Sequence, residues 1–225
     1  QDGYRQYCSW RRTKGMVEMN YDIKAIETKY AGTIFRSRLE ARWAAFFDVF
    51  GWSWVYEPFD LDGWFPDFLL KPVSPNREGV LVEVKPITKF CKDTANQIEK
   101  ALLKTNNELE PLLVGLEPIF HDETGEGSKI GWLAERFDYP DCDEGWDWGR
   151  APLRDFLMPQ NDLDTNWGLL ADFCHEEQDY TGRMTNYHEG NVGYMSPNIC
   201  RYYWGEACNK VKYQPKEKMG DNRFI

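Results

Sequence analysis

Three charged residues in the first half of the chain have the types and the spacing of a hydrolytic site. Asp67 follows Pro66, and Glu83 comes sixteen positions later, two residues before Lys85. Side chains at positions i and i+2 of a strand point to one face, so we expect Glu83 and Lys85 to project together. A hairpin between their strand and the one that Asp67 enters would bring Asp67 beside Glu83.

The chemistry that fits this group of side chains is metal-assisted hydrolysis of a phosphodiester. Two carboxylates a few ångströms apart are costly unless a cation lies between them, and ligands that are all oxygen suit Mg²⁺ or Mn²⁺. Such a cation lowers the pKa of bound water and neutralises the charge that develops on phosphorus. A neighbouring lysine can orient the water and stabilise the charge that the metal does not reach.

The apolar pattern predicts the elements that must position these residues. Apolar side chains recur at helical spacing from Phe35 to Phe50, with Thr33 as the candidate N-cap and Gly51 at the end of the run. Further along, the pattern predicts four strands and one more helix, which are strands 52–56, 64–70, 80–84 and 111–116 and helix 92–105. This α-β-β-β-α-β order predicts an α/β fold with a mixed sheet flanked by helices.

The motif Pro66-Asp67, followed by Glu83-Val84-Lys85 and preceded by a helix that carries Glu40, resembles the PD-(D/E)XK nuclease superfamily. The segments 35–43 and 81–86 look like small phage-type members, and the resemblance covers roughly Tyr30 to Leu116. It implies a restriction-endonuclease-like core with a mixed central sheet. It also implies a Mg²⁺-dependent nuclease that cuts DNA, with RNA as a further option.

The resemblance also implies a role for each residue of the motif. Asp67 and Glu83 would ligate Mg²⁺ (or Mn²⁺), and the backbone carbonyl of Val84 would supply another oxygen. Lys85 would position the attacking water, and Glu40 would assist metal or water binding.

Each of these side chains also has a structural interpretation without catalysis. Glu40 fits a capping box with Ser37, or an ion pair with Arg36 one turn earlier. Glu83 and Lys85 could form a salt bridge on a solvated strand face. The function that corresponds to this reading is a non-catalytic binding or assembly module on a nuclease-like fold.

Basic and polar residues on or just before the two predicted helices are candidates for contacts with nucleic acid. They are Arg36, Arg38, Lys89, Gln97, Lys100 and Lys104. Three of them, Gln97, Lys100 and Lys104, share one side of the second helix, clear of the apolar stripe formed by Ala95, Ile98 and Leu102. Such residues could follow phosphates as point charges or could equally form a solvated helix face. Gln97 also resembles a glutamine that supports the site in many superfamily members.

The composition is that of a packed chain. Of the 225 residues 42% are hydrophobic and 16% are aromatic, which excludes the disordered class, and no period indicates a collagen-like one. Apolar runs are only a few residues long, so no membrane span is predicted. No basic and apolar leader opens the chain, and we expect a soluble protein in the cytoplasm of a bacterial or phage-infected cell.

The net charge of −10 arises in the second half of the chain. Residues 1–116 carry equal numbers of basic and acidic side chains, whereas residues 117–189 carry five Lys and Arg against eighteen Asp and Glu. We interpret the acidic stretch as a solubilising insertion that packs its tryptophans on the sheet. The alternative is a surface that imitates a phosphate backbone or binds a protein partner, with a homodimer also open.

The chain therefore divides into an N-terminal extension (1–20), a nuclease core (21–116) and an irregular C-terminal elaboration packed on the core (117–225). In the elaboration we expect a hairpin between 119–120 and 130–132, mostly irregular structure over 138–190, and a helix from Tyr202 to about Lys212. A zinc site is not expected, because soft ligands that come in close pairs are typical of structural zinc, and only the adjacent Cys174 and His175 come close. The other soft ligands of this half are His188, Cys200 and Cys208.

Overall fold

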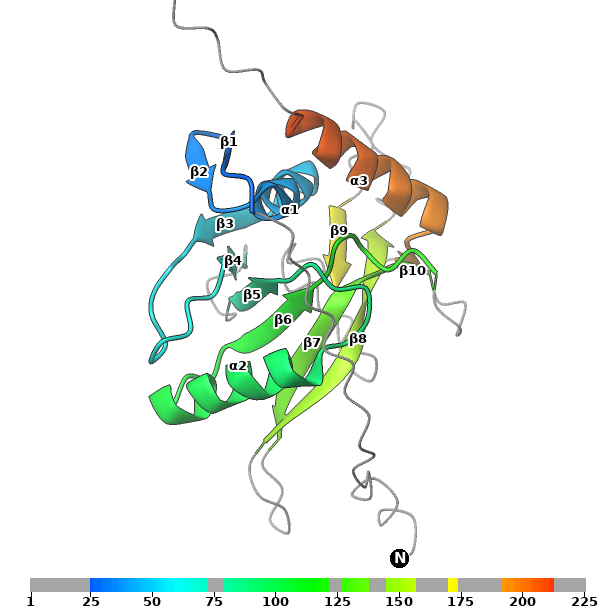
Figure 1. Ribbon diagram of the computed structural model, residues 1–225. Helices are drawn as coiled ribbons and strands as arrows, with labels where there is room; N and C mark the ends of the chain where they lie inside the picture. The colour runs from blue at the N-terminus through cyan, green and yellow to red at the C-terminus, as the bar shows by residue number, and fades with distance from the viewer. Residues whose placement is uncertain are drawn as a thin grey trace, which may run out of the picture.

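The chain builds a central sheet with helices on both faces (Figure 1). The computed structural model describes residues 25–72, 79–121, 127–137, 145–156, 170–173 and 192–212. The helices in these residues are α1 (Arg38–Val49), α2 (Lys92–Thr105) and α3 (Pro197–Lys210). The strands are β1 (Thr28–Tyr30), β2 (Thr33–Phe35), β3 (Ser53–Tyr56), β4 (Phe68–Lys71), β5 (Val80–Val84), β6 (Glu110–Val114), β7 (Lys129–Phe137), β8 (Gly145–Phe156), β9 (Leu170–Phe173) and β10 (Val192–Tyr194).

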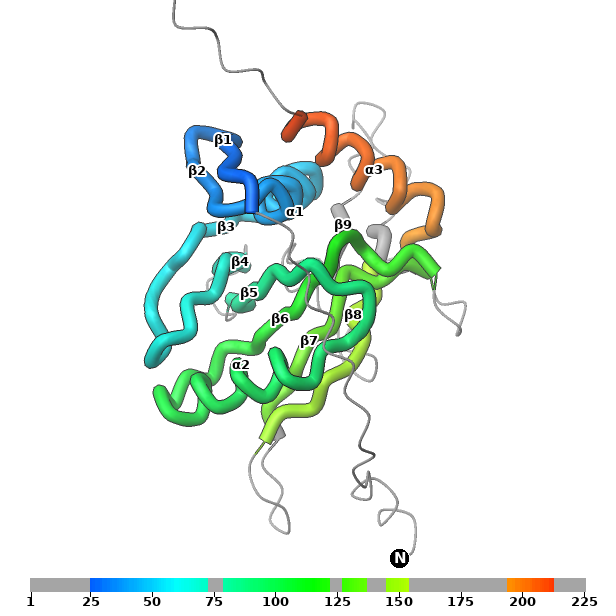
Figure 2. The backbone as a smooth tube through the Cα atoms, viewed as in Figure 1, coloured from blue at the N-terminus to red at the C-terminus, as the bar shows by residue number. Residues whose placement is uncertain are grey.

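The strand order of the described sheet is β10-β8-β7-β6-β5-β4-β3, with β9 also paired to β8. The strands β3, β4 and β5 form an antiparallel meander, whereas β5 and β6 run parallel. Parallel neighbours need a crossover connection, and Figure 2 shows that α2 makes it. From α1 to β6 the chain follows the predicted α-β-β-β-α-β order, and the prediction of a mixed sheet is confirmed.

The start of α1 differs from the prediction. Thr33 lies in β2, and the N-cap is Ser37, whose Oγ accepts a hydrogen bond from the backbone N–H of Glu40 at 3.1 Å. The prediction of Thr33 is wrong because β2 pairs with β1 before the helix begins. The end agrees with the prediction, since Phe50 is the C-cap and Gly51 follows with φ of +69°, a left-handed conformation that favours glycine.

Buried side chains on both faces fix the helices to the sheet. On one face α1 packs Phe47 on Phe68 of β4, with 5.4 Å between the ring centroids. On the other face α2 buries Ile98 and Leu102 against Leu81 of β5, along the predicted apolar stripe. Val82 of β5 belongs to the buried cluster of α1, and its neighbour Leu81 belongs to the buried cluster of α2. Consecutive residues of β5 therefore face opposite layers, as the two-residue period of a strand requires.

A buried hydrogen bond ties α1 to the end of the sheet where β5 and β6 finish. The indole N–H of Trp43 donates to the carbonyl of Gly115 at 2.8 Å. A side chain at Gly115 would collide with the backbone, because an added Cβ would lie 2.4 Å from the carbonyl oxygen of Ile87. Next to it, the N–H of Lys85 donates to the carbonyl of Val114 at 3.0 Å. These contacts hold α1 and the two strand ends at fixed positions.

The last helix packs on the first. In α3, Trp204 contacts Trp43 of α1 with ring centroids 4.8 Å apart. The helix starts at Pro197 with Ser196 as N-cap, five residues before the predicted start at Tyr202, so that boundary is wrong. No helix in the described parts of the chain is long and apolar enough to cross a membrane.

The acidic second half continues the sheet. The prediction of mostly irregular structure over 138–190 is wrong for β8, a twelve-residue strand that pairs with β7, and for β9. The predicted hairpin is supported by a bridge between Ile119 and Lys129. The remainder of that stretch (138–144, 157–169 and 174–190) and the predicted extension 1–20 lie outside the described residues.

Candidate active site

The pairing of β4 with β5 brings Asp67 next to Glu83. Phe68 lies opposite Val82, so the next position of the antiparallel ladder places Asp67 across from Glu83. The Asp67 side chain is only 5% exposed, and its Oδ2 accepts a hydrogen bond from the backbone N–H of Val84 at 2.8 Å. The expected hairpin geometry is therefore present at the entrance of β4.

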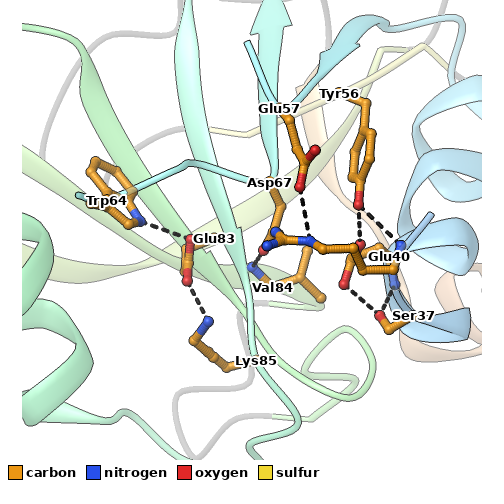
Figure 3. A network of polar contacts seen from close by, with 10 residues as sticks. Ser37, Glu40, Tyr56, Glu57, Trp64, Asp67, Glu83, Val84 and Lys85 are labelled. Atoms are coloured by element: carbon orange, nitrogen blue, oxygen red, sulfur yellow. Dashed lines mark hydrogen bonds and ion pairs between the residues drawn. The ribbon is translucent and has the colours of Figure 1, made fainter. Parts of the chain in front are cut away.

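Glu83 lies at the end of β5 and is held from two sides (Figure 3). Its Oε1 forms an ion pair with Nζ of Lys85, and its Oε2 accepts the indole N–H of Trp64 at 2.8 Å. Burial of the ammonium would lower the pKa of Lys85, but the negative charge of Glu83 outweighs it and the pKa is raised. Lys85 is thus a firmly protonated donor beside the carboxylates.

Arg36 reaches the same place from the connection between β2 and α1. Its Nη2 donates to Oδ1 of Asp67 at 2.8 Å, and its Nε donates to Oε1 of Glu57 at 2.8 Å. The helical pair with Glu40, one of the alternatives open from the sequence, is replaced by these two contacts. Arg36 therefore contacts a carboxylate of the site, and its contact with nucleic acid stays a prediction.

Glu40 belongs to the neighbouring network at the start of α1. Ser37 Oγ donates to its Oε1 at 2.7 Å, and the hydroxyl of Tyr56 donates to its Oε2 at 2.6 Å. Ser37 therefore caps the helix through its Oγ, and the Glu40 carboxylate accepts the Ser37 hydroxyl. The Tyr56 hydroxyl also accepts the backbone N–H of Arg36 at 3.1 Å, so this network fixes the segment from which the Arg36 side chain extends.

The electrostatics of the site are dominated by burial. Burial raises the pKa of Asp67 to about 7, the negative charges of Glu83 and Glu40 add to the increase, and the Val84 N–H and Lys85 oppose it. Burial therefore makes the ionised Asp67 carboxylate costly near neutral pH, even with the Val84 N–H and Lys85 beside it. A site that raises the pKa of a buried carboxyl in this way favours a cation as its partner.

The donor set fits a hard divalent cation. Asp67 and Glu83 offer two buried carboxylates, and Mg²⁺ is commonly bound by one or two carboxylates with water in the remaining positions. In the described residues no three His, Cys, Asp or Glu side chains gather as a metal-binding group. Glu40 is occupied by Ser37 and Tyr56, so a cation would rely on the two carboxylates, the Val84 carbonyl and water.

The candidate nucleic-acid residues of α2 lie on its outer side. Gln97, Lys100 and Lys104 are exposed, whereas the apolar stripe is buried, as predicted. Lys104 forms an ion pair with Asp62 in the connection between β3 and β4. In the part of the chain that the structure describes, no hydrogen bond or ion pair joins Gln97 or Lys100 to the carboxylates. Lys89 is exposed and Arg38 is half-buried.

Three residues of the site were not singled out from the sequence, namely Tyr56, Glu57 and Trp64. Trp64 was expected in a strand, but it closes a turn with Leu61, whose N–H donates to the Trp64 carbonyl at 2.8 Å. The Asp62-Gly63 pair signals that turn. The soft metal ligands Cys174, His175 and His188 lie outside the described residues, Cys200 is buried and Cys208 is half-buried.

Replacing Trp64 by phenylalanine is expected to weaken Mn²⁺ binding about 10-fold, because groups that orient a metal ligand contribute to affinity on that scale. The matched control is Trp148→Phe, since the Trp148 indole donates to Glu99 at 2.7 Å, outside the site. Titration calorimetry on the metal-protein mixture measures both. Equal losses of affinity in the two variants would contradict a positioning role for Trp64.

Comparison of the chain with protein-family models, with curated proteins and with solved structures finds no match. The case for a function therefore depends on the geometry of the site and on the motif that the chain carries.

Proposed function

We propose that the protein is a divalent-metal-dependent nuclease that hydrolyses phosphodiester bonds, with DNA as the substrate. The observation that carries the proposal is the convergence of Asp67, Glu83 and Lys85, which come from two paired strands and meet at one end of the sheet. Two buried carboxylates beside a lysine fit the chemistry of phosphodiester hydrolysis better than they fit a solvated strand face.

The order of elements supports membership of the PD-(D/E)XK superfamily. The helix α1, the meander β3-β4-β5, the crossover α2 and the parallel strand β6 follow the order that the motif implies. Asp67 lies at the entrance of β4, and Glu83 lies at the end of β5. This membership is part of the proposal.

Asp67, Glu83 and the Val84 carbonyl would hold Mg²⁺ or Mn²⁺. When bound, such a cation lowers the pKa of a coordinated water and offsets negative charge on a phosphate. Lys85 carries three N–H donors on a side chain that is 41% exposed, and it can donate to a water or to a phosphate oxygen in front of the carboxylates. Glu40, Tyr56 and Ser37 keep the start of α1 beside Asp67.

The test is cleavage of supercoiled, linear, single-stranded and RNA substrates in Mn²⁺, with wild type and Glu83→Gln compared. We expect the wild type to nick plasmid and Glu83→Gln to lose about 10³-fold in rate, because a carboxylate ligand becomes a neutral amide. Glu99→Gln is the matched control, since it alters another glutamate that accepts a tryptophan N–H.

Retained cleavage in Glu83→Gln would contradict the mechanism. If the wild type shows no heat of Mn²⁺ binding and cleaves no substrate, the nuclease proposal is wrong. The non-catalytic binding module would then be the remaining candidate function. Cleavage of RNA alone would change the substrate while keeping the site.

A further inference from the structure

Every carboxylate oxygen of Asp67 and Glu83 accepts a donor from the protein itself. Two of the four donors are neutral, the backbone N–H of Val84 and the indole N–H of Trp64. The other two are cations, Arg36 on Asp67 and Lys85 on Glu83. Two formal negative charges thus face two formal positive charges, and the chain supplies for itself the charge that a divalent cation would bring.

The two cations are held differently. Lys85 directly follows the buried strand that carries Glu83, and its ammonium pairs with that carboxylate. Arg36 extends from a connection, and its side chain is 58% exposed although the carboxylate that it contacts is 5% exposed. Arg36 can therefore leave Asp67 by side-chain rotation, without any change in the backbone.

Glu57 holds the same guanidinium through a second contact. Its carboxylate accepts the Arg36 Nε, and its backbone N–H donates to the carbonyl of Asp67 at 3.0 Å. Glu57 has a φ of +45°, a left-handed conformation that is strained for a residue with a side chain. The strained residue directly follows β3, and the Glu57 carboxylate lies 2.8 Å from Nε of the guanidinium that also contacts Asp67.

We propose that Arg36 is a latch on the carboxylate site: it pairs with Asp67 when no divalent cation is bound, and it moves to the phosphate of the substrate when one is. This inference rests on the proposed nuclease function and adds a substrate contact to it.

The exchange follows from the chemistry of the two partners. A guanidinium and a divalent cation repel each other and would compete for the Asp67 carboxylate. Without the metal, leaving the buried carboxylate unpaired is costly, so Arg36 stays on Asp67. With a divalent cation on Asp67, the Arg36 guanidinium would lose that partner and would be free to bind another anion. Its planar fork of donors matches two oxygens of a phosphate.

The latch makes two measurable quantities move in opposite directions. Because Arg36 must leave before the metal binds, the apparent metal affinity of the wild type is reduced by the fraction of molecules that are closed. Removing Arg36 should therefore tighten metal binding while it slows cleavage. A residue that merely supports the fold would weaken both.

The experiment is titration calorimetry with Mn²⁺ in the absence of nucleic acid, together with steady-state cleavage. For Arg36→Met we expect Mn²⁺ affinity about 10-fold higher and kcat about 100-fold lower than in the wild type. Arg36→Lys keeps the charge without the fork, so it should bind Mn²⁺ like the wild type and cleave more slowly. Arg136→Gln is the control, because Arg136 pairs with Glu108 at 2.9 Å outside the site.

The outcomes separate the latch from the function. If the wild type binds Mn²⁺ and cleaves while Arg36→Met binds the metal with equal or lower affinity, the latch is wrong and the nuclease stands. If Arg36→Met does not fold, Arg36→Lys provides the test. A wild-type kcat in Arg36→Lys would contradict the contact between Arg36 and the phosphate. If the wild type neither binds Mn²⁺ nor cleaves, the proposed function itself falls, and the latch with it.

Discussion

Lys85→Ala is expected to lower the cleavage rate by about 10²–10⁴-fold, with the fold intact. The reason is positional, because the Lys85 ammonium is paired with Glu83 and faces the place where Asp67 and Glu83 converge. Removing it takes away the donor that can orient a water or stabilise charge on a phosphate oxygen. Single-turnover cleavage of plasmid in Mn²⁺, at saturating protein, measures the change in the chemical step.

Two variants make the Lys85 result specific. Lys85→Arg keeps the charge but replaces a compact ammonium by a planar guanidinium, and we expect it to remain folded and slow. Lys71→Ala removes an exposed lysine from the far end of β4 and should cleave like the wild type. A wild-type rate for Lys85→Ala would mean that the attacking water is positioned by another group and that the mechanism stated above is incorrect.

The second large effect is on stability. The metal-free protein is expected to become less stable as the pH rises from about 4 to about 7, by on the order of a few kcal/mol from the buried pair Asp67 and Glu83. Burial and the charges of Glu83 and Glu40 raise the pKa of Asp67 from 3.8 to about 7 in the folded protein. Between these values the folded state binds a proton that the unfolded state has released. Stability is therefore highest at the acidic end and falls as the pH rises through this window.

Urea unfolding in a chelator, at several pH values between 5 and 8, measures this slope. Asp67→Asn should lack the fall in stability, because an amide does not titrate. The free energy of unfolding of the variant minus that of the wild type should therefore be larger at pH 8 than at pH 5. Asp147→Asn, which changes an exposed aspartate of β8, should keep the wild-type slope. The same fall with pH in Asp67→Asn and in the wild type would show that other groups cause it.

Much of the core that positions these residues was predictable because it depends on short periods. The apolar stripe of α2 follows from the 3.6-residue period of a helix, and the placement of Glu83 and Lys85 on one side of β5 follows from the two-residue period of a strand. The approach of Asp67 to Glu83 needed one further assumption, that β4 and β5 pair as neighbours, and neighbouring segments of a chain often do.

The contacts around the carboxylates could not be predicted because they join elements that are distant in the chain. Arg36 and Asp67 are thirty-one residues apart, and Trp64 and Glu83 are nineteen apart. Such pairs depend on the angle at which α1 crosses the sheet and on the path of the connection before β4. Neither property leaves a periodic trace in the sequence.

The missed strand β8 has a local explanation. Trp146 is buried, Asp147 is exposed and Trp148 is half-buried, so the strand alternates, but acidic and glycine residues around it suggest a loop. The early start of α3 was signalled by Ser196-Pro197, a capping residue followed by a proline at the first position of the helix. In both cases nearby residues of low strand or helix propensity outweighed the local pattern in the prediction.

The contact between Trp204 and Trp43 has a consequence for any shorter version of this protein. A fragment ending at Leu116 would leave Trp43 and Phe46 without the aromatic ring that covers them. It would also turn β6 into a bare edge, with backbone N–H and C=O groups open to pairing with other molecules. If such a fragment self-associates, the cause would be these newly exposed rings and this open strand edge. The acidic half of the chain thus covers the half that carries the carboxylates.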